Sequence, residues 1–150
     1  MQTSIVTGGA FDLTLCGAEK MHEASQSYGE EIVALLDRVW PVLRTTGARQ
    51  NGINVAVYDA DGTVFAGVEL LEPDAGLLPG LAIRRVHFDR HVSFTHVGPY
   101  RLLGEAHQRV RDEIARQGWT VAPPVVEVYG HWSDDESKLQ TRIVCGIEER

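Results

Sequence analysis

The sequence has few cysteines, no long apolar run and no basic cluster, and each shortage removes a class of protein. Cys16 and Cys145 are its two cysteines, and neither belongs to a CxxC or Cys/His motif. We therefore expect buried thiols rather than a disulfide or a metal centre. Every apolar run is shorter than the roughly 20 residues of a membrane-spanning helix. The first residues also lack the basic segment of a secretory signal, so we expect a cytoplasmic protein without membrane partners.

Acidic residues outnumber basic ones by 21 to 14, which gives a formal net charge of -7 at pH 7. No run of lysines and arginines could follow a phosphate backbone, and no segment has the pattern of a helix-turn-helix module, so direct nucleic-acid binding is disfavoured. The GxSxG, GxxxxGKS/T and GxGxxG motifs do not occur. The sequence thus gives no sign of a serine hydrolase, a P-loop enzyme or dinucleotide binding, and we expect no cofactor.

Two short motifs resemble metal sites without matching them. His87, His91 and His96 are spaced by four and five residues, which is not a common zinc pattern. Residues 59–62 start like a calcium loop but lack its third acidic position and its distal glutamate, so we interpret them as a hairpin turn. No bound metal is predicted.

Two segments match each other over about 30 positions at a constant offset of 71 residues, without a gap. In the first, apolar spacing predicts an amphipathic helix that starts near residue 28, after the capping box of Ser27 and Glu30, and ends at Gly47. In the second, the same offset predicts a helix over 99–117 that ends at Gly118. The matching apolar positions are Ile32 and Leu103, Val39 and Val110, and Leu43 and Ile114.

Short runs of β-branched residues follow each predicted helix. Residues 54–58 and 64–70 predict a hairpin closed by Asp61-Gly62, and residues 125–129 and 141–147 predict a hairpin with a longer acidic loop. Further strands are expected over 13–16, 81–88 and 92–97. A long connection over 16–27 would then precede the first helix.

Each half of the chain, about 11–72 and 81–148, is thus expected to be a strand, a helix and a hairpin. One such unit cannot bury both its helix and its sheet face alone. We therefore predict a single α+β domain over residues 1–150, with an antiparallel sheet, helices on one face, pseudo-twofold symmetry and a ligand cleft between the halves.

Strand parity divides the two equivalent strands into faces. One face, uniformly apolar and therefore expected under the helices, carries Val55, Val57, Val126 and Val128. The opposite face, expected to line the cleft, carries Ala56, Tyr58, Val125, Glu127 and Tyr129.

Glu127 stands where the first half has Ala56, within an apolar run in which an unpaired carboxylate would be costly to bury. A functional carboxylate explains this position, and the alternative is a solvated residue on a strand face open to water. The other candidates for the ligand site are aromatic, although packing is the commoner role of such residues. They are Tyr58, Tyr100, Tyr129, Phe94, Trp40 and Trp132, the last of which lies where it would cover the mouth of a cleft.

Residues 94–100 (FTHVGPY) before the second helix, with Glu127-Val128-Tyr129 after it, resemble the HxGPY and ExY landmarks of the gyrase-inhibitor-like (GyrI-like) small-molecule-binding domains. The duplicated layout extends the resemblance over nearly the whole chain. It implies a central pocket for amphipathic, often aromatic and cationic compounds, with Glu127 as the acceptor of positive charge and with Tyr129 and Tyr100 at motif positions. Such domains serve MerR-type or AraC-type transcription regulators as effector-binding modules, or stand alone, as we expect here.

The leading hypothesis is a bacterial, non-enzymatic protein that binds a multidrug or effector compound, aromatic or cationic, beside the buried carboxylate of Glu127. One alternative is a hydrolase of reactive electrophilic natural products, in which Glu127 activates water and Tyr129 donates a proton. Another is a protein that inhibits a partner such as gyrase, for which an acidic surface would be suitable.

Overall fold

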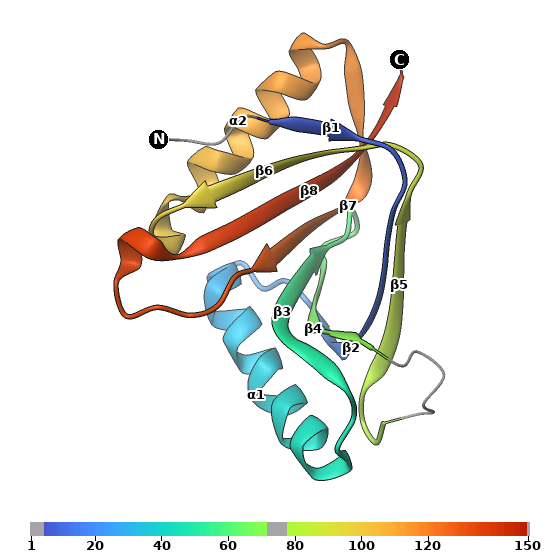
Figure 1. Cartoon of the computed structure of the whole chain (residues 1–150), viewed down its shortest axis with the longest axis vertical. Helices are drawn as coiled ribbons and strands as arrows, with labels where there is room; N and C mark the ends of the chain where they lie inside the picture. The colour runs from blue at the N-terminus through green and yellow to red at the C-terminus, as the bar shows by residue number, and fades with distance from the viewer. Residues whose placement is uncertain (1–4, 72–77, 150) are drawn as a thin grey trace. The chain divides into compact units, whose positions relative to one another are not determined.

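The computed structural model describes residues 5–71 and 78–149 (Figure 1). The chain divides into two compact units: unit 1 comprises Met1–Asp12 and His87–Arg150, and unit 2 comprises Leu13–Val86. The expected end of the first half, at residue 72, lies outside the described residues. Each unit combines antiparallel strands with one α-helix, so the predicted α+β class is confirmed. The pseudo-twofold symmetry and the cleft stay predictions.

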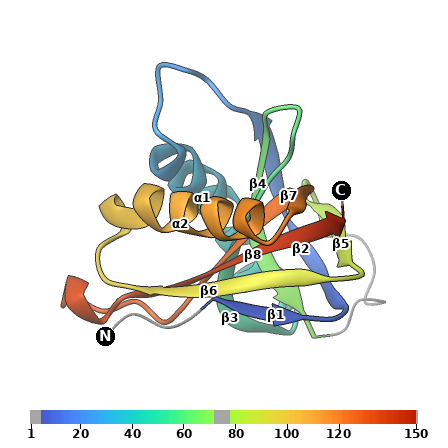
Figure 2. The same ribbon diagram turned by 90° about the horizontal axis from the view of Figure 1, so that it is seen from above.

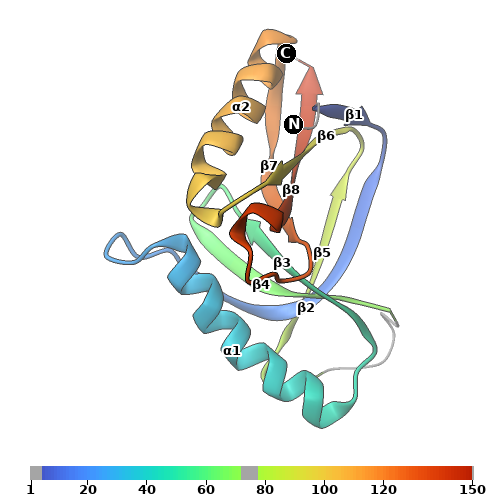
Figure 3. The ribbon, with the colours of Figure 1, turned by 60° about the vertical axis from the view of Figure 1, so that its left-hand side comes forward.

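Unit 2 holds α1 (Tyr28–Thr46), β3 (Gln50–Tyr58) and β4 (Thr63–Leu70), with most of β2 (Phe11–Met21) and β5 (Ala82–Phe88). Its strands follow the order β3-β4-β2-β5. β4 pairs antiparallel with β3 on one side and with β2 on the other. α1 lies against β4, as Figure 3 shows.

Unit 1 holds four strands, β1 (Val6–Gly8), β6 (His91–Val97), β7 (Trp119–Tyr129) and β8 (Gln140–Glu149). They follow the order β1-β6-β8-β7, and every neighbouring pair is antiparallel. The short 3-10 helix η1 (Tyr100–Leu102) leads into α2 (Leu103–Arg116), and a second one, η2 (Glu136–Lys138), precedes β8. α2 lies across one face of these strands (Figure 2) and contacts β6 and β7. None of the helices in the described part of the chain is long and apolar enough to cross a membrane.

α1 begins and ends where the sequence predicts. The Ser27 side chain accepts a hydrogen bond from the Glu30 backbone N–H, and the Glu30 side chain accepts one from the Ser27 N–H, which completes the capping box. At the other end Gly47 takes a left-handed conformation, with φ 67°, and its N–H donates to the Leu43 carbonyl.

The first turn of α1 is tied to β2 by a buried carboxylate. The side chain of Glu31 is fully buried and accepts hydrogen bonds from Lys20 Nζ at 2.8 Å and from the Glu23 backbone N–H at 3.0 Å. His22 Nδ1 lies 2.5 Å from its other oxygen. Hydrogen bonding to Lys20 is the largest of the effects that lower the pKa of Glu31 to about 2. Glu31 is therefore ionised and paired inside unit 2.

The predicted repeat is visible in the burial of the two helices. The buried apolar residues of α1 include Leu35, Val39 and Leu43, and those of α2 lie 71 residues later in each case, at Ala106, Val110 and Ile114. Gly118 follows α2 with a positive φ of 81°, as Gly47 follows α1. The constant offset therefore places equivalent residues on the buried side of both helices.

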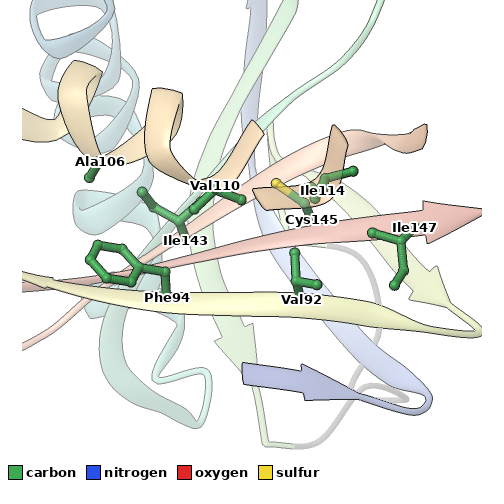
Figure 4. Packing of buried hydrophobic residues seen from close by; sticks show 8 residues of the cluster. All are labelled: Val92, Phe94, Ala106, Val110, Ile114, Ile143, Cys145 and Ile147. Carbon is green, nitrogen blue, oxygen red and sulfur yellow. The ribbon is translucent and has the colours of Figure 1, made fainter. Parts of the chain in front are cut away.

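A buried apolar cluster fills the space between α2 and the strands of unit 1 (Figure 4). α2 contributes Ala106, Val110 and Ile114; β6 contributes Val92 and Phe94; β8 contributes Ile143, Cys145 and Ile147. Trp119, at the start of β7, packs against the cluster, and the Arg90 guanidinium lies 5.2 Å from its ring centroid. α2 is thus held by ordinary core packing.

Both cysteines are buried and free, as expected. Burial raises the pKa of the Cys145 thiol to about 11 and also raises that of Cys16. Both therefore remain protonated at neutral pH, which makes them poor nucleophiles.

The largest differences from the predictions concern β2, β7 and β1. β2 continues to Met21 instead of ending at Cys16, so the expected long connection before α1 is wrong. β7 begins at Trp119 rather than near residue 125, and its register with β8 shifts between Ala122 and Val125. β1 was not predicted at all; it pairs with β6 through Val6–Gly8.

Candidate functional site

Glu127 lies on the face of β7 that α2 covers. Val125, on the same face, packs against the cluster under α2, and His107 of α2 contacts the Glu127 carboxylate. The prediction that Val126 and Val128 mark the face under the helix is therefore wrong. Val126 is fully buried on the other face, so apolar side chains there do not reveal which side the helix covers.

The same correction applies in unit 2. Trp40 of α1 donates from Nε1 to Asn54 Oδ1 at 2.9 Å, and the rings of Tyr28 and Tyr58 meet edge to face, with centroids 5.2 Å apart. The even-numbered residues of this part of β3 therefore face α1, and they include Ala56, which is fully buried. Val55 and Val57 face away from α1.

Polar side chains from α2 and β7 contact the Glu127 carboxylate. The Tyr129 hydroxyl donates to Oε1 at 2.5 Å, and His107 Nε2 lies 2.6 Å from Oε2. Glu127 itself is 3% exposed. A carboxylate this deeply buried requires compensation, and each of its oxygens receives a hydrogen bond from a different element of unit 1.

Tyr100 extends the site toward solvent. Its ring meets that of Tyr129 edge to face, with centroids 5.7 Å apart, and Tyr100 is 40% exposed at the start of η1. Burial of part of the side chain raises the pKa of the Tyr100 phenol. The phenol is therefore a neutral hydrogen-bond donor at physiological pH.

The strand register places two rows of side chains on the face beneath α2 and η1. One row joins Phe94, Ile143 and Glu127, and the next joins His96, Thr141 and Tyr129. Phe94 belongs to the apolar cluster, and the Arg109 guanidinium lies 5.1 Å from its ring centroid. Phe94 therefore shares a face with Glu127, with Ile143 between them.

The residues predicted for the ligand site fall into two groups, with Trp132 apart from both. Glu127, Tyr129 and Tyr100 come together in unit 1, where Phe94 lies on the same face. Trp40, Ala56 and Tyr58 belong to unit 2 and line the contact between α1 and β3. Trp132 lies in the loop after β7 and is 76% exposed.

Sequence patterns did not identify His107 as a partner of Glu127. A signal for His107 was present in the repeat, because the position 71 residues earlier is Leu36, just as Ala56 precedes Glu127 by 71 residues. One half therefore has both polar residues and the other has neither.

The three histidines weighed as a metal cluster have separate partners. His87 lies between Asp12 and Asp89, while His91 Nδ1 contacts the Gly9 carbonyl and His96 Nε2 contacts the Pro99 carbonyl. Within residues 5–71 and 78–149, no group of three or more histidine, cysteine or acidic side chains is arranged to hold a metal ion.

No family model and no curated protein matches this chain. Among solved structures, EcmrR in complex with DNA matches with a TM-score of 0.80 and 13% sequence identity. That match covers 98% of this chain but only 58% of EcmrR. The isolated C-terminal domain of EcmrR matches with a TM-score of 0.75 and 12% identity, over 98% of both chains.

Two further matches carry information about ligands and activity in related folds. SAV2435 bound to tetraphenylphosphonium has a TM-score of 0.67 and 15% identity, over 97% of this chain and 94% of its own. A hydrolase from Listeria innocua has a TM-score of 0.59 and 9% identity, over 96% of this chain and 91% of its own. These likenesses establish the fold. They show that this chain shares its fold with the EcmrR C-terminal domain and with SAV2435.

Proposed function

We propose that this chain binds amphipathic aromatic cations, and that the Glu127 carboxylate accepts their positive charge. The observation that carries the proposal is the burial of this carboxylate, at 3% exposure, between His107 and Tyr129. A charge in such surroundings interacts more strongly than one at the surface, because solvent screens it less. The electrostatic contribution to binding would therefore be larger for a cation beside Glu127 than for one on the acidic surface.

The aromatic neighbours fit the same class of ligand. Tyr129 contacts the carboxylate through its hydroxyl, and the Tyr100 ring packs against the Tyr129 ring. Aromatic rings attract organic cations through their π faces. Tyr100 is partly exposed and its ring contacts Tyr129, the hydrogen-bond partner of Glu127. We infer that a ligand enters by displacing the Tyr100 ring. The tetraphenylphosphonium bound to SAV2435, a protein of the same fold, supports this choice of ligand.

The test compares tetraphenylphosphonium with the neutral triphenylphosphine oxide by calorimetry and thermal shift. We expect Glu127→Gln to lower the affinity for the cation by about tenfold or more, equivalent to about 1.4 kcal/mol. The affinity for the neutral compound should stay nearly unchanged. Glu105→Gln is the matched control, since it removes the same charge from an exposed position of α2. Equal cation binding by wild type and Glu127→Gln would refute the proposal. So would an equal loss in Glu105→Gln, which would indicate general attraction to an acidic surface.

A second candidate is the hydrolysis of electrophilic compounds. It is favoured by the hydrogen bond between Tyr129 and Glu127, which joins a proton donor to a carboxylate able to activate water, and a hydrolase from Listeria innocua has the same fold. Mass analysis after incubation with epoxides and activated esters would detect turnover. Activity abolished by both Glu127→Gln and Tyr129→Phe would favour the enzyme, whereas consumption that persists in both variants would exclude this site.

A further inference from the structure

Thr141 has a buried hydroxyl group without a hydrogen-bond partner in the described part of the chain. The residue is 0% exposed, and its Oγ1 forms no hydrogen bond with any of the described residues. Buried side-chain hydroxyls are normally paired, because an unpaired one loses its hydrogen bonds to water without replacement. This position therefore calls for a partner that residues 5–71 and 78–149 do not provide.

Thr141 lies beside the Glu127 site. It pairs across the strands with Tyr129 of β7 and with His96 of β6, and the row of Glu127 follows directly on the same face. Diagonal neighbours on adjacent antiparallel strands have Cβ atoms roughly 7–8 Å apart. The Thr141 hydroxyl and the Glu127 carboxylate are therefore close enough for one small molecule to span them.

The polar groups on either side of Thr141 are directed elsewhere. The hydroxyl proton of Tyr129 is donated to Glu127 Oε1, and His96 Nε2 contacts the Pro99 carbonyl at 3.1 Å. A hydroxyl that can both donate and accept thus remains beside the buried carboxylate.

We propose that Thr141 is the second polar contact of the ligand site and donates a hydrogen bond to an acceptor atom on the cation held by Glu127. This inference rests on the proposed function and narrows its ligand class. The preferred compounds are aromatic cations with an oxygen or nitrogen acceptor a few bonds from the charged centre. Cations without such an acceptor, among them tetraphenylphosphonium, bind through charge and ring contacts alone.

The test uses two cations of matched size, (3-hydroxypropyl)triphenylphosphonium, which has an acceptor, and butyltriphenylphosphonium, which has none. Thr141→Val removes the hydroxyl and keeps the shape of the side chain. We expect it to lower the affinity for the hydroxypropyl compound about fivefold. The affinity for the butyl compound should stay within about twofold of the wild-type value. Thr141→Ser keeps the hydroxyl, so the ratio of its affinities for the two compounds should equal that of wild type.

A second readout separates ligand recognition from a structural role. The unliganded Thr141→Val protein should unfold at the same urea concentration as wild type or at a higher one, since an unpaired buried hydroxyl has been removed. A lower midpoint would reveal a partner within the fold and overturn the inference. If both cations bind and the ratio of their affinities is unchanged in Thr141→Val, this inference alone fails. If neither cation binds the wild type, the proposed function fails and this inference with it.

Discussion

The Nε2 atom of His107 lies 2.6 Å from Oε2 of Glu127, and this contact joins α2 to β7 within unit 1. At the equivalent positions of the other half, 71 residues earlier, stand Leu36 and Ala56. Both halves bury the same side of their helices, so the apolar pair is a natural replacement for the polar one.

Removing His107 alone should destabilise the protein more than removing the pair. In His107→Leu a buried carboxylate loses one of its hydrogen bonds, and we expect a loss of about 1–3 kcal/mol in the free energy of unfolding. The double variant His107→Leu with Glu127→Ala should recover part of that loss, because neither polar group is left behind. Urea unfolding of the four proteins of this cycle measures the coupling. Strictly additive effects would mean that the two side chains do not interact in solution.

The stability of unit 2 should depend on pH through Glu31. Its pKa is lowered from 4.5 to about 2, chiefly by the hydrogen bond from Lys20, so its stabilising effect is present above about pH 4.5 and disappears as the pH falls toward 2. Glu31→Gln should therefore unfold at lower urea than wild type at pH 7, and the difference should shrink below pH 4.5. Glu105→Gln, an exposed change, should follow the wild type throughout. If Glu31→Gln and wild type differed by the same urea concentration at every pH, the effect would come from the shape of the side chain rather than from its charge.

The capping box should contribute measurably to the stability of α1. Ser27→Ala leaves the Glu30 backbone N–H without its acceptor, and we expect a loss of about 1 kcal/mol. Ser27→Asp keeps an acceptor at the same position and should retain most of the stability. Thermal unfolding followed by circular dichroism compares the three proteins, and equal melting temperatures for Ser27→Ala and wild type would contradict the prediction.

β2 and β4 approach each other where Gly17 pairs with Gly67. A Cβ atom on Gly17 would lie 2.2 Å from the Ala66 carbonyl oxygen, and backbone cannot move aside as a flexible side chain can. Gly17→Ala should therefore cost about 3 kcal/mol or more. Gly47→Ala is the contrasting variant, because it meets no atom within 4 Å and bears only the strain of its positive φ, about 1–2 kcal/mol. Similar losses of unfolding free energy in the two variants would show that β2 and β4 separate easily.

Much of the fold could be predicted because local signals and the repeat agreed. Ser27, Glu30 and Gly47 fixed the ends of α1, and the offset of 71 transferred its buried positions to α2. The full length of β2 was not predicted, because residues 16–27 were expected to form a connection. In the fold Lys20, near the end of β2, is paired with the buried Glu31 of α1. β1 was missed because three residues held mainly by backbone pairing with β6 leave no side-chain pattern.

The candidate site was predicted in part. Strand parity correctly placed Glu127 and Tyr129 on one face, and the repeat identified Glu127 as the position where the halves differ. The choice of face failed because Val126 is buried as completely as a residue under the helix would be. His107 could not be joined to Glu127 from sequence alone, since their contact depends on how α2 packs on β7 across 20 residues of chain.

The positions of the tryptophans make each unit separately observable. Trp40 donates to Asn54 in unit 2, Trp119 lies beneath Arg90 in unit 1, and Trp132 is exposed to water. In a Trp132→Phe background, removing either of the other indoles leaves a fluorophore that senses one unit only. The fluorescence unfolding curves of two such proteins would superimpose if the chain unfolds in a single cooperative transition. They would differ if one unit unfolds before the other.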